Sequence, residues 1–172
     1  MRTSPRSRRT MTLLAAAALA TSGLFATSAA SAAPAGGKAG AEPVKAGFML
    51  ASNMNNRCLE VRNGNPSAGA LVNMWDCHGG TNERWTWNGL TLRSDLNGKC
   101  LDVVAGNAEN GAALNMWDCY GGAPQQWQWD NGRLRNPVYN RCLTIGNGNW
   151  WNGASVILWD CNLGSHQQWH TV

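Results

Sequence analysis

Charged side chains are scarce in this sequence. Lys and Arg number 14 and Asp and Glu number 10, so charged residues make up 14% of the 172 positions. Four of the arginines fall within the first nine positions, and over the rest of the chain ten basic residues face ten acidic ones. A protein that binds nucleic-acid phosphates needs a basic surplus or stripe. We therefore expect no nucleic-acid partner.

Long apolar runs are absent as well, so we expect no membrane span. The apolar stretch 11–24 is broken by polar residues and is too short to cross a bilayer. Arginines precede it, and the Ala-Ser-Ala sequence at 30–32 has the form that signal peptidase accepts. We expect residues 1–32 to be a signal peptide and 33–47 a flexible leader. The protein is then secreted, by the general secretory or the twin-arginine route.

Metal-binding and catalytic signatures are also missing. The six cysteines include no C-x-x-C pair and the three histidines do not recur with them, so we expect no metal and no cofactor. No G-x-S-x-G or H-E-x-x-H motif follows the predicted signal peptide. A glycosidase needs two carboxylates across a cleft, and Glu60 and Glu83 are the only pair that suggests one. We expect a protein that is not an enzyme, with a small glycosidase as an alternative.

What the sequence contains instead is a repeat with a period of 42 residues, starting at Met49. Cysteines, tryptophans, leucines and turn-forming Gly-Asn pairs all recur at this period, and three copies extend to the last residue. The recurring tryptophans are Trp75 and Trp85, Trp117 and Trp127, and Trp159 and Trp169.

Within each copy, apolar and polar residues alternate, which is the period of a half-buried strand. Each copy has room for about four short strands separated by Gly and Asn turns, or about twelve in all. One copy cannot bury its own apolar face, whereas three copies that close on one another bury a shared core and hide the sheet edges. We predict an all-β fold with pseudo-threefold symmetry over 48–172. A two-sheet sandwich with internal similarity is the alternative.

The six cysteines are expected to form disulfides, because secretion exposes them to an oxidising environment. Few of the possible pairings respect a threefold repeat, and pairing within each copy is the simplest of them. The predicted bridges join residues 19 apart: Cys58 to Cys77, Cys100 to Cys119 and Cys142 to Cys161.

These motifs resemble the subdomains of ricin B-type β-trefoil lectins, which are similar to carbohydrate-binding module family 13. The second copy is the most similar, with Cys100-Leu101-Asp102-Val103, Trp117-Asp118-Cys119 and the Q-x-W motif of the family at Gln125-Gln126-Trp127. The resemblance extends from about Phe48 to Val172. It implies a β-trefoil that binds sugars through up to one shallow site per copy, and we expect a monomeric module that stands alone.

The composition suits a neutral glycan. Sugars offer hydroxyls to carboxylate and amide groups, and an apolar face to aromatic rings. The sequence supplies 19 Asn and ten Trp with few charges. Galactose- or xylose-type residues of a polysaccharide are candidate ligands, although many of the asparagines must serve turns.

The resemblance also implies which residues bind. In the family, the acidic residue two after the first cysteine, the aromatic residue two before the second cysteine, and polar residues at the start of Q-x-W form the site. The second copy supplies Asp102, Asn115, Trp117 and Gln125, with Pro124 where the family has Asn. The first copy supplies Glu60, Asn73, Trp75 and Asn82.

The three predicted sites differ in quality. We rank the second copy first. The first copy ranks second because Glu83 replaces Gln, and two carboxylates facing one small pocket repel, which raises one pKa or invites a cation. The third copy has Thr144, Ile157 and His166 at site positions, and we expect its site to be weak or inactive.

Several of these residues have a structural alternative. Trp85, Trp127 and Trp169 are predicted to fill the core, and Asp76, Asp118 and Asp160 to hold turns. Trp75, Trp117 and Trp159 serve either stacking or packing, and Gln125 and Gln167 either bind or support their neighbours.

Trp150 and Trp151 have no counterparts in the other copies and form either an exposed platform or a buried patch. A trefoil that binds or inhibits a protein is the remaining alternative.

Overall fold

The computed structural model describes residues 47–172. The predicted signal peptide, and the predicted leader up to residue 46, lie outside the described residues. Within the described part no helix is long and apolar enough to cross a bilayer.

The described part is all-β, as predicted, and has four strands in each copy. The first copy holds β1 (Phe48–Ser52), β2 (Cys58–Val61), β3 (Val72–Trp75) and β4 (Arg84–Asn88). The second holds β5 (Thr91–Ser94), β6 (Cys100–Val103), β7 (Leu114–Trp117) and β8 (Gln128–Asp130). The third holds β9 (Arg133–Asn136), β10 (Arg141–Ile145), β11 (Val156–Asp160) and β12 (Trp169–Thr171).

Short 3-10 turns follow the second and third strands of each copy. They are η1 (Arg62–Gly64), η2 (Thr81–Glu83), η3 (Val104–Gly106), η4 (Ala123–Gln125), η5 (Gly146–Gly148) and η6 (Ser165–Gln167). The turns after the second strands place a residue at positive φ, namely Asn63, Ala105 and Asn147.

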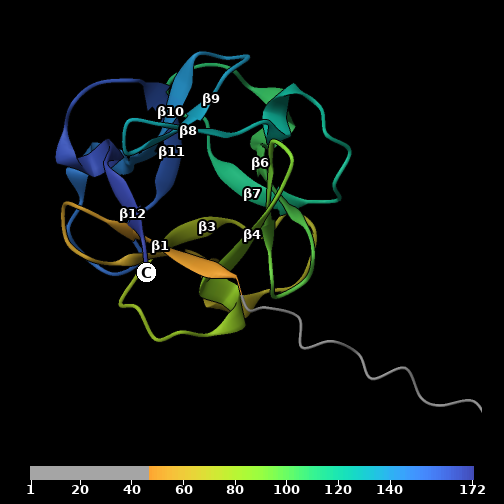
Figure 1. Cartoon of the computed structure of the whole chain (residues 1–172), viewed down its shortest axis with the longest axis horizontal. Helices are drawn as coiled ribbons and strands as arrows, with labels where there is room; N and C mark the ends of the chain where they lie inside the picture. Colours follow the sequence, from red (N-terminus) through yellow and green to blue (C-terminus); the bar gives the residue numbers. More distant parts are fainter. Residues whose placement is uncertain (1–46) are drawn as a thin grey trace, which may run out of the picture. The chain divides into compact units, whose positions relative to one another are not determined.

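The three copies form three lobes around a common centre (Figure 1). The middle two strands of each copy pair as an antiparallel hairpin, β2 with β3, β6 with β7 and β10 with β11. The first strand β1 pairs with β4 of its own copy and with the last strand β12, so the end of the chain returns to its start. This closed arrangement is the predicted β-trefoil, and the sandwich alternative is wrong.

The three hairpins are joined by equivalent backbone hydrogen bonds. Gly69 N–H donates to Met116 O, Gly111 N–H to Leu158 O and Gly153 N–H to Met74 O, each over 2.8 Å. All three glycines have φ between 84° and 89°, a conformation that favours glycine. Each hairpin therefore depends on a glycine turn to reach its neighbour.

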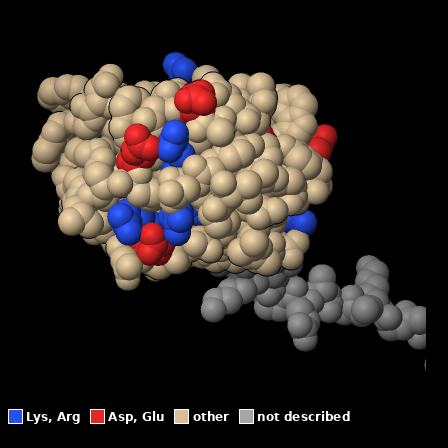
Figure 2. All heavy atoms as spheres, turned by 90° about the horizontal axis from the view of Figure 1, so that it is seen from above, with Lys and Arg blue, Asp and Glu red and all other residues tan. Residues whose placement is uncertain are grey.

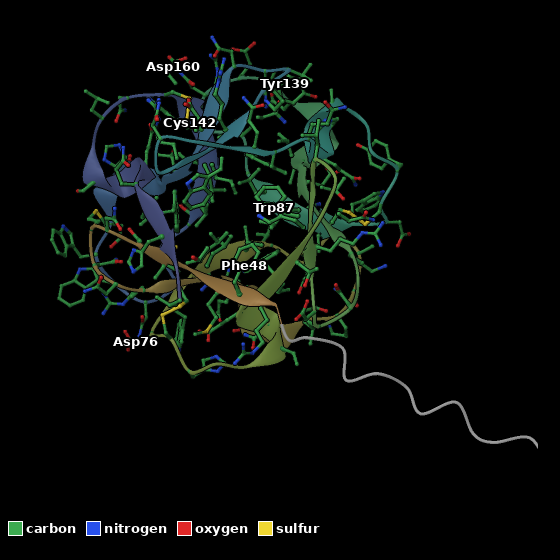
Figure 3. The ribbon with its side chains drawn as sticks, viewed as in Figure 1. Phe48, Asp76, Trp87, Tyr139, Cys142 and Asp160 are labelled. Atoms are coloured by element: carbon green, nitrogen blue, oxygen red, sulfur yellow. A yellow bond between two sulfur atoms is a disulfide. The ribbon has the colours of Figure 1, made fainter. Side chains whose placement is uncertain are left out.

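Three tryptophans fill the centre, as predicted. Trp85, Trp127 and Trp169 are buried, and each indole N–H donates to the main-chain carbonyl of the leucine after a first cysteine. The one polar group of each buried indole is thus paired. Phe48 and Trp87 also lie toward the centre, whereas Asp76 and Asp160 lie on the rim (Figure 3).

The predicted disulfides are confirmed. Cys58 bonds to Cys77, Cys100 to Cys119 and Cys142 to Cys161, and no cysteine of the described chain is free. Each bridge ties the start of a hairpin to its end.

Candidate functional site

Each copy has a shallow cavity beside its hairpin. The cavity of the first copy is about 350 Å³ and is lined by Glu60, Asn63, Gly64, Trp75, His78 and Asn82. That of the second is about 370 Å³ and is lined by Asp102, Val104, Ala105, Gly106, Asn115, Trp117 and Tyr120. That of the third is about 260 Å³ and is lined by Thr144, Ile145, Asn147, Gly148, Ile157, Trp159 and His166.

The register of the hairpins explains why these residues meet. In the first copy β2 and β3 pair Glu60 with Asn73, and in the second β6 and β7 pair Asp102 with Asn115. Cross-strand partners point to the same face of a sheet. Both carboxylates are only 5% exposed, so each forms the floor of its cavity.

An indole ring forms one wall of each cavity. Trp75, Trp117 and Trp159 are between 41% and 46% exposed, far more than the core tryptophans. An exposed ring beside a buried carboxylate presents an apolar face and a hydrogen-bond acceptor to one ligand. This geometry favours stacking over packing for the rings of the first and second copies.

Gln125 holds the carboxylate of the second cavity. Its side chain is fully buried, and its Oε1 accepts the backbone N–H groups of Tyr120 and Gly121 over 2.9 and 3.1 Å. Its Nε2 donates to Asp102 Oδ2 over 2.8 Å and to Asp118 O over 2.9 Å. All four contacts are within the protein, so Gln125 acts on a ligand by positioning Asp102.

Other groups of the second cavity remain open to a ligand. Asn115 is nearly buried, yet its Oδ1 has no partner within the described chain. A buried amide oxygen is costly to leave unpaired, so a sugar hydroxyl or water at this position is favourable. Tyr120, which is mostly exposed, stands at the mouth of the cavity.

The electrostatics of the second cavity centre on Asp102. Burial raises the pKa of its carboxyl above the usual value, although hydrogen bonds from Gln125 and Tyr120 oppose that rise. Burial and the neighbouring Asp102 charge also raise the pKa of the Tyr120 hydroxyl. Tyr120 therefore stays a hydrogen-bond donor at neutral pH.

The first cavity has a different supporting arrangement. Asn82 Nδ2 donates to Glu60 Oε2 over 2.8 Å, which keeps this carboxylate oriented toward the cavity. Glu83 is fully buried beneath it, and its Oε2 accepts the backbone N–H groups of His78 and Gly79. Burial, with the nearby Glu83 charge adding to it, raises the pKa of Glu60.

The third cavity contains no carboxylate. Gln167 Nε2 donates to Thr144 Oγ1 over 2.8 Å, and the hydroxyl of Thr144 donates to Cys142 O over 2.8 Å. Ile157 takes the place of the cross-strand asparagine. The acceptor that the other two cavities offer at their floor is therefore missing here.

All eight predicted site residues lie in or directly behind the two cavities that the sequence pairs them with. Six of them line the cavities, while Asn73 and Gln125 lie behind the linings. Direct contact of any of them with a sugar stays a prediction. His78 and Tyr120, which directly follow the second cysteines of the first and second copies, were not among the predicted site residues. A polar aromatic ring at this position in two of the three copies was the available signal.

Two other predicted roles can be compared with the structure. Asp76, Asp118 and Asp160 are exposed on the rim, and each forms an ion pair with the basic residue before the first cysteine of its copy. These contacts support a structural role. Trp150 and Trp151 are 59% and 76% exposed, so they do not form a buried patch.

Similar proteins share this architecture. A designed threefold-symmetric protein, ThreeFoil, has 28% identity and a TM-score of 0.68 over 73% of this chain and 96% of its own. The C-half of an earthworm R-type lectin, solved in complex with GalNAc, has 20% identity and a TM-score of 0.62 over 72% and 95%. A ricin B-like lectin from Macrolepiota procera, solved in complex with lactose, has 24% identity and a TM-score of 0.61 over 72% and 92%.

The family model described as the ricin-type beta-trefoil lectin domain matches residues 46–169. This range contains all six cysteines, strands β1 to β11 with the first residue of β12, and the residues that line the three cavities. The chain therefore belongs to the ricin-type β-trefoil lectin domain family.

Proposed function

We propose that this protein is a secreted, non-catalytic lectin that binds neutral glycans through the cavities of its first and second copies. The observation that carries the proposal is the pairing of a half-exposed indole with a buried, amide-supported carboxylate in each of these two cavities. Such a pair matches the apolar face and the hydroxyls of one sugar ring. Galactose- or xylose-type residues are the candidate ligands.

The surface supports a neutral ligand. On the face shown in Figure 2, most side chains are uncharged, and the few basic and acidic ones are interspersed. A polyanion would need a continuous basic area. The proposed partner is accordingly a neutral polysaccharide or glycan, bound by a monomer.

The contacts of the Glu60 and Glu83 pair do not favour a glycosidase. A glycosidase needs two carboxyl groups about 5–9.5 Å apart on either side of the scissile bond. Here Glu60 and Glu83 place carboxylate oxygens within 4.8 Å of each other. Glu83 is fully buried, and one of its oxygens accepts hydrogen bonds from two backbone N–H groups. Glu83 therefore cannot reach a substrate.

Isothermal titration against galactose, lactose, xylan and mannan tests the proposal. We expect millimolar binding of at least one sugar, about −4 kcal/mol. Asp102→Ala should lose at least tenfold in affinity for the polysaccharide and, for a free sugar, one of the two binding equivalents. Thr144→Ala, in the third cavity, is the matched control and should bind as the wild type does. Unchanged binding by Asp102→Ala would falsify the site assignment. No heat with any glycan favours a protein partner, and sugar release over time favours an enzyme.

Secretion has its own test. Expression of the full chain in a bacterial host with a functional export system should yield mature protein in the medium or periplasm. N-terminal sequencing of that protein is expected to give a start near Ala33, after the Ala-Ser-Ala site. Protein that keeps its first residues and stays in the cytoplasm would contradict this part of the proposal.

A further inference from the structure

The first cavity has a side-chain cluster of which the proposed lectin function uses only Glu60. Glu60, His78 and Glu83 each place one potential ligand atom within 4.8 Å of the other two. His78 Nε2 lies 3.5 Å from Glu83 Oε1 and 3.8 Å from Glu60 Oε2. Among the described residues this is the only group of three or more His, Cys, Asp or Glu side chains with that proximity.

One atom of the cluster is left without a hydrogen bond. Glu83 is fully buried, and its Oε1 has no hydrogen-bond partner, whereas its Oε2 accepts two backbone N–H groups. Among the described residues, the one basic group within ion-pairing distance of Oε1 is the His78 ring, at 3.5 Å. A buried carboxylate oxygen without a donor or cation is unfavourable, so this atom needs a ligand.

The other two copies show what is missing. There the equivalent residues are Gln125 and Gln167, and their Nε2 groups donate to the floor residue of the cavity and to a main-chain carbonyl. In the first copy an oxygen takes the place of that NH₂ group. The corresponding neighbours, the Glu60 carboxylate and the Asp76 carbonyl, only accept hydrogen bonds. A cation between the carboxylates removes this conflict.

We propose that Glu60, His78 and Glu83 form a binding site for one divalent transition-metal ion of the Zn²⁺ type. An imidazole nitrogen and two carboxylate oxygens are a donor set that suits Zn²⁺. Bonds of about 2.1 Å at tetrahedral angles place neighbouring ligand atoms about 3.4 Å apart. The two separations from the imidazole, 3.5 and 3.8 Å, need only a small contraction, and the two carboxylates place ligand oxygens within 4.8 Å of each other. Ca²⁺ needs about six to eight oxygens, which three side chains do not supply.

Metal binding through His78 Nε2 breaks one hydrogen bond of the imidazole ring. His78 Nδ1 accepts the backbone N–H of Gly80 over 3.2 Å, which leaves the ring proton on Nε2. Coordination through Nε2 requires the other tautomer and breaks this hydrogen bond. The side chain of His78 is 49% exposed, so water replaces the lost contact and an ion has a route into the cluster.

The test is titration of ZnCl₂ into the untagged full chain with its disulfides intact, in the absence of any glycan. We expect one equivalent of Zn²⁺ to bind with a micromolar Kd, and neither Ca²⁺ nor Mg²⁺ to bind. Glu83→Gln and His78→Tyr install the residues of the second copy at these positions. Each should fold as the wild type does, by circular dichroism, and lose at least tenfold in Zn²⁺ affinity.

Three results would overturn the proposal: no heat with Zn²⁺, equal Zn²⁺ binding by wild type and Glu83→Gln, or Ca²⁺ binding as tight as Zn²⁺ binding. The first of these results, together with a higher thermal midpoint for Glu83→Gln, would mean that the two carboxyl groups share a proton instead. Since the readout contains no sugar, failure of the lectin proposal does not affect it.

Discussion

Asp102 is the residue at which binding and stability are expected to conflict. Because burial raises the pKa of its carboxyl in the folded chain, the folded state holds this proton more tightly than the unfolded state does. Its ionisation therefore reduces stability as the pH rises through the folded-state pKa. We predict that Asp102→Asn raises the urea midpoint at pH 7, that this gain shrinks as the pH falls through the folded-state pKa, and that glycan binding at the second cavity is lost.

The matched control for this prediction is Asp118→Asn. Asp118 is exposed and forms an ion pair with Lys99 over 2.5 Å, so its replacement should not stabilise the protein at pH 7. The measurement is urea unfolding of both variants at pH 7 and pH 4. A lower midpoint for Asp102→Asn at pH 7 would show that the hydrogen bonds to the Asp102 carboxylate stabilise the folded state by more than its burial destabilises it.

Ala105 is a residue in a conformation that suits another side chain. Its φ is 54°, while the equivalent residues of the other copies, Asn63 and Asn147, have φ of 56° and 54°. A left-handed conformation costs an alanine about 1–2 kcal/mol, and Asn tolerates it better. We predict that Ala105→Asn stabilises the protein by about 0.5–1 kcal/mol and that Asn63→Ala destabilises it by a similar amount. Chemical denaturation measures both, and effects of the same sign would contradict the argument.

At the scale of elements, each disulfide closes the two ends of one hairpin. The three bridges have the same sequence separation of 19, which by chain entropy corresponds to about 3 kcal/mol each. We predict that the double variant Cys142→Ala/Cys161→Ala loses about that much in urea unfolding. Unfolding should remain a single transition because the third hairpin bonds to the other two. A separate transition for the third copy would mean that the lobes fold independently.

The elements show how far sequence reasoning reaches. A 42-residue period places strands, core tryptophans and disulfides correctly, because each copy must repeat the contacts of its neighbours. The same register argument brings Asp102 opposite Asn115. It does not show that Gln125 is fully buried, since that depends on the path of η4 under the cavity. Cysteine spacing predicted no metal, whereas the replacement of Gln by Glu83 already indicated a raised pKa or a cation. That Glu83 Oε1 is buried without a hydrogen-bond partner is seen only in the structure.

At the scale of the whole molecule, the number of working cavities determines how tightly a polymer is held. The trefoil presents one cavity per lobe, and two of the three have a carboxylate at the floor. A single sugar site of millimolar affinity captures little ligand, whereas two sites on one polysaccharide act with a high effective concentration. Modest avidity and poor agglutination are the expected consequences.

A set of single-cavity variants tests this dependence on valency. Asp102→Ala and Glu60→Ala should each reduce affinity for the polysaccharide about tenfold or more, since each leaves one site and abolishes the avidity gain. For a monosaccharide, each variant should instead lose one of two binding equivalents and keep the affinity of the other. Thr144→Ala should change neither quantity, because its cavity offers no carboxylate. Affinity electrophoresis in a gel containing the polysaccharide, with titration of the free sugar, measures both. If Thr144→Ala weakens retention as much as Asp102→Ala does, the third lobe also binds. The number of binding sites would then equal the number of cavities with an indole ring, not the number with a carboxylate.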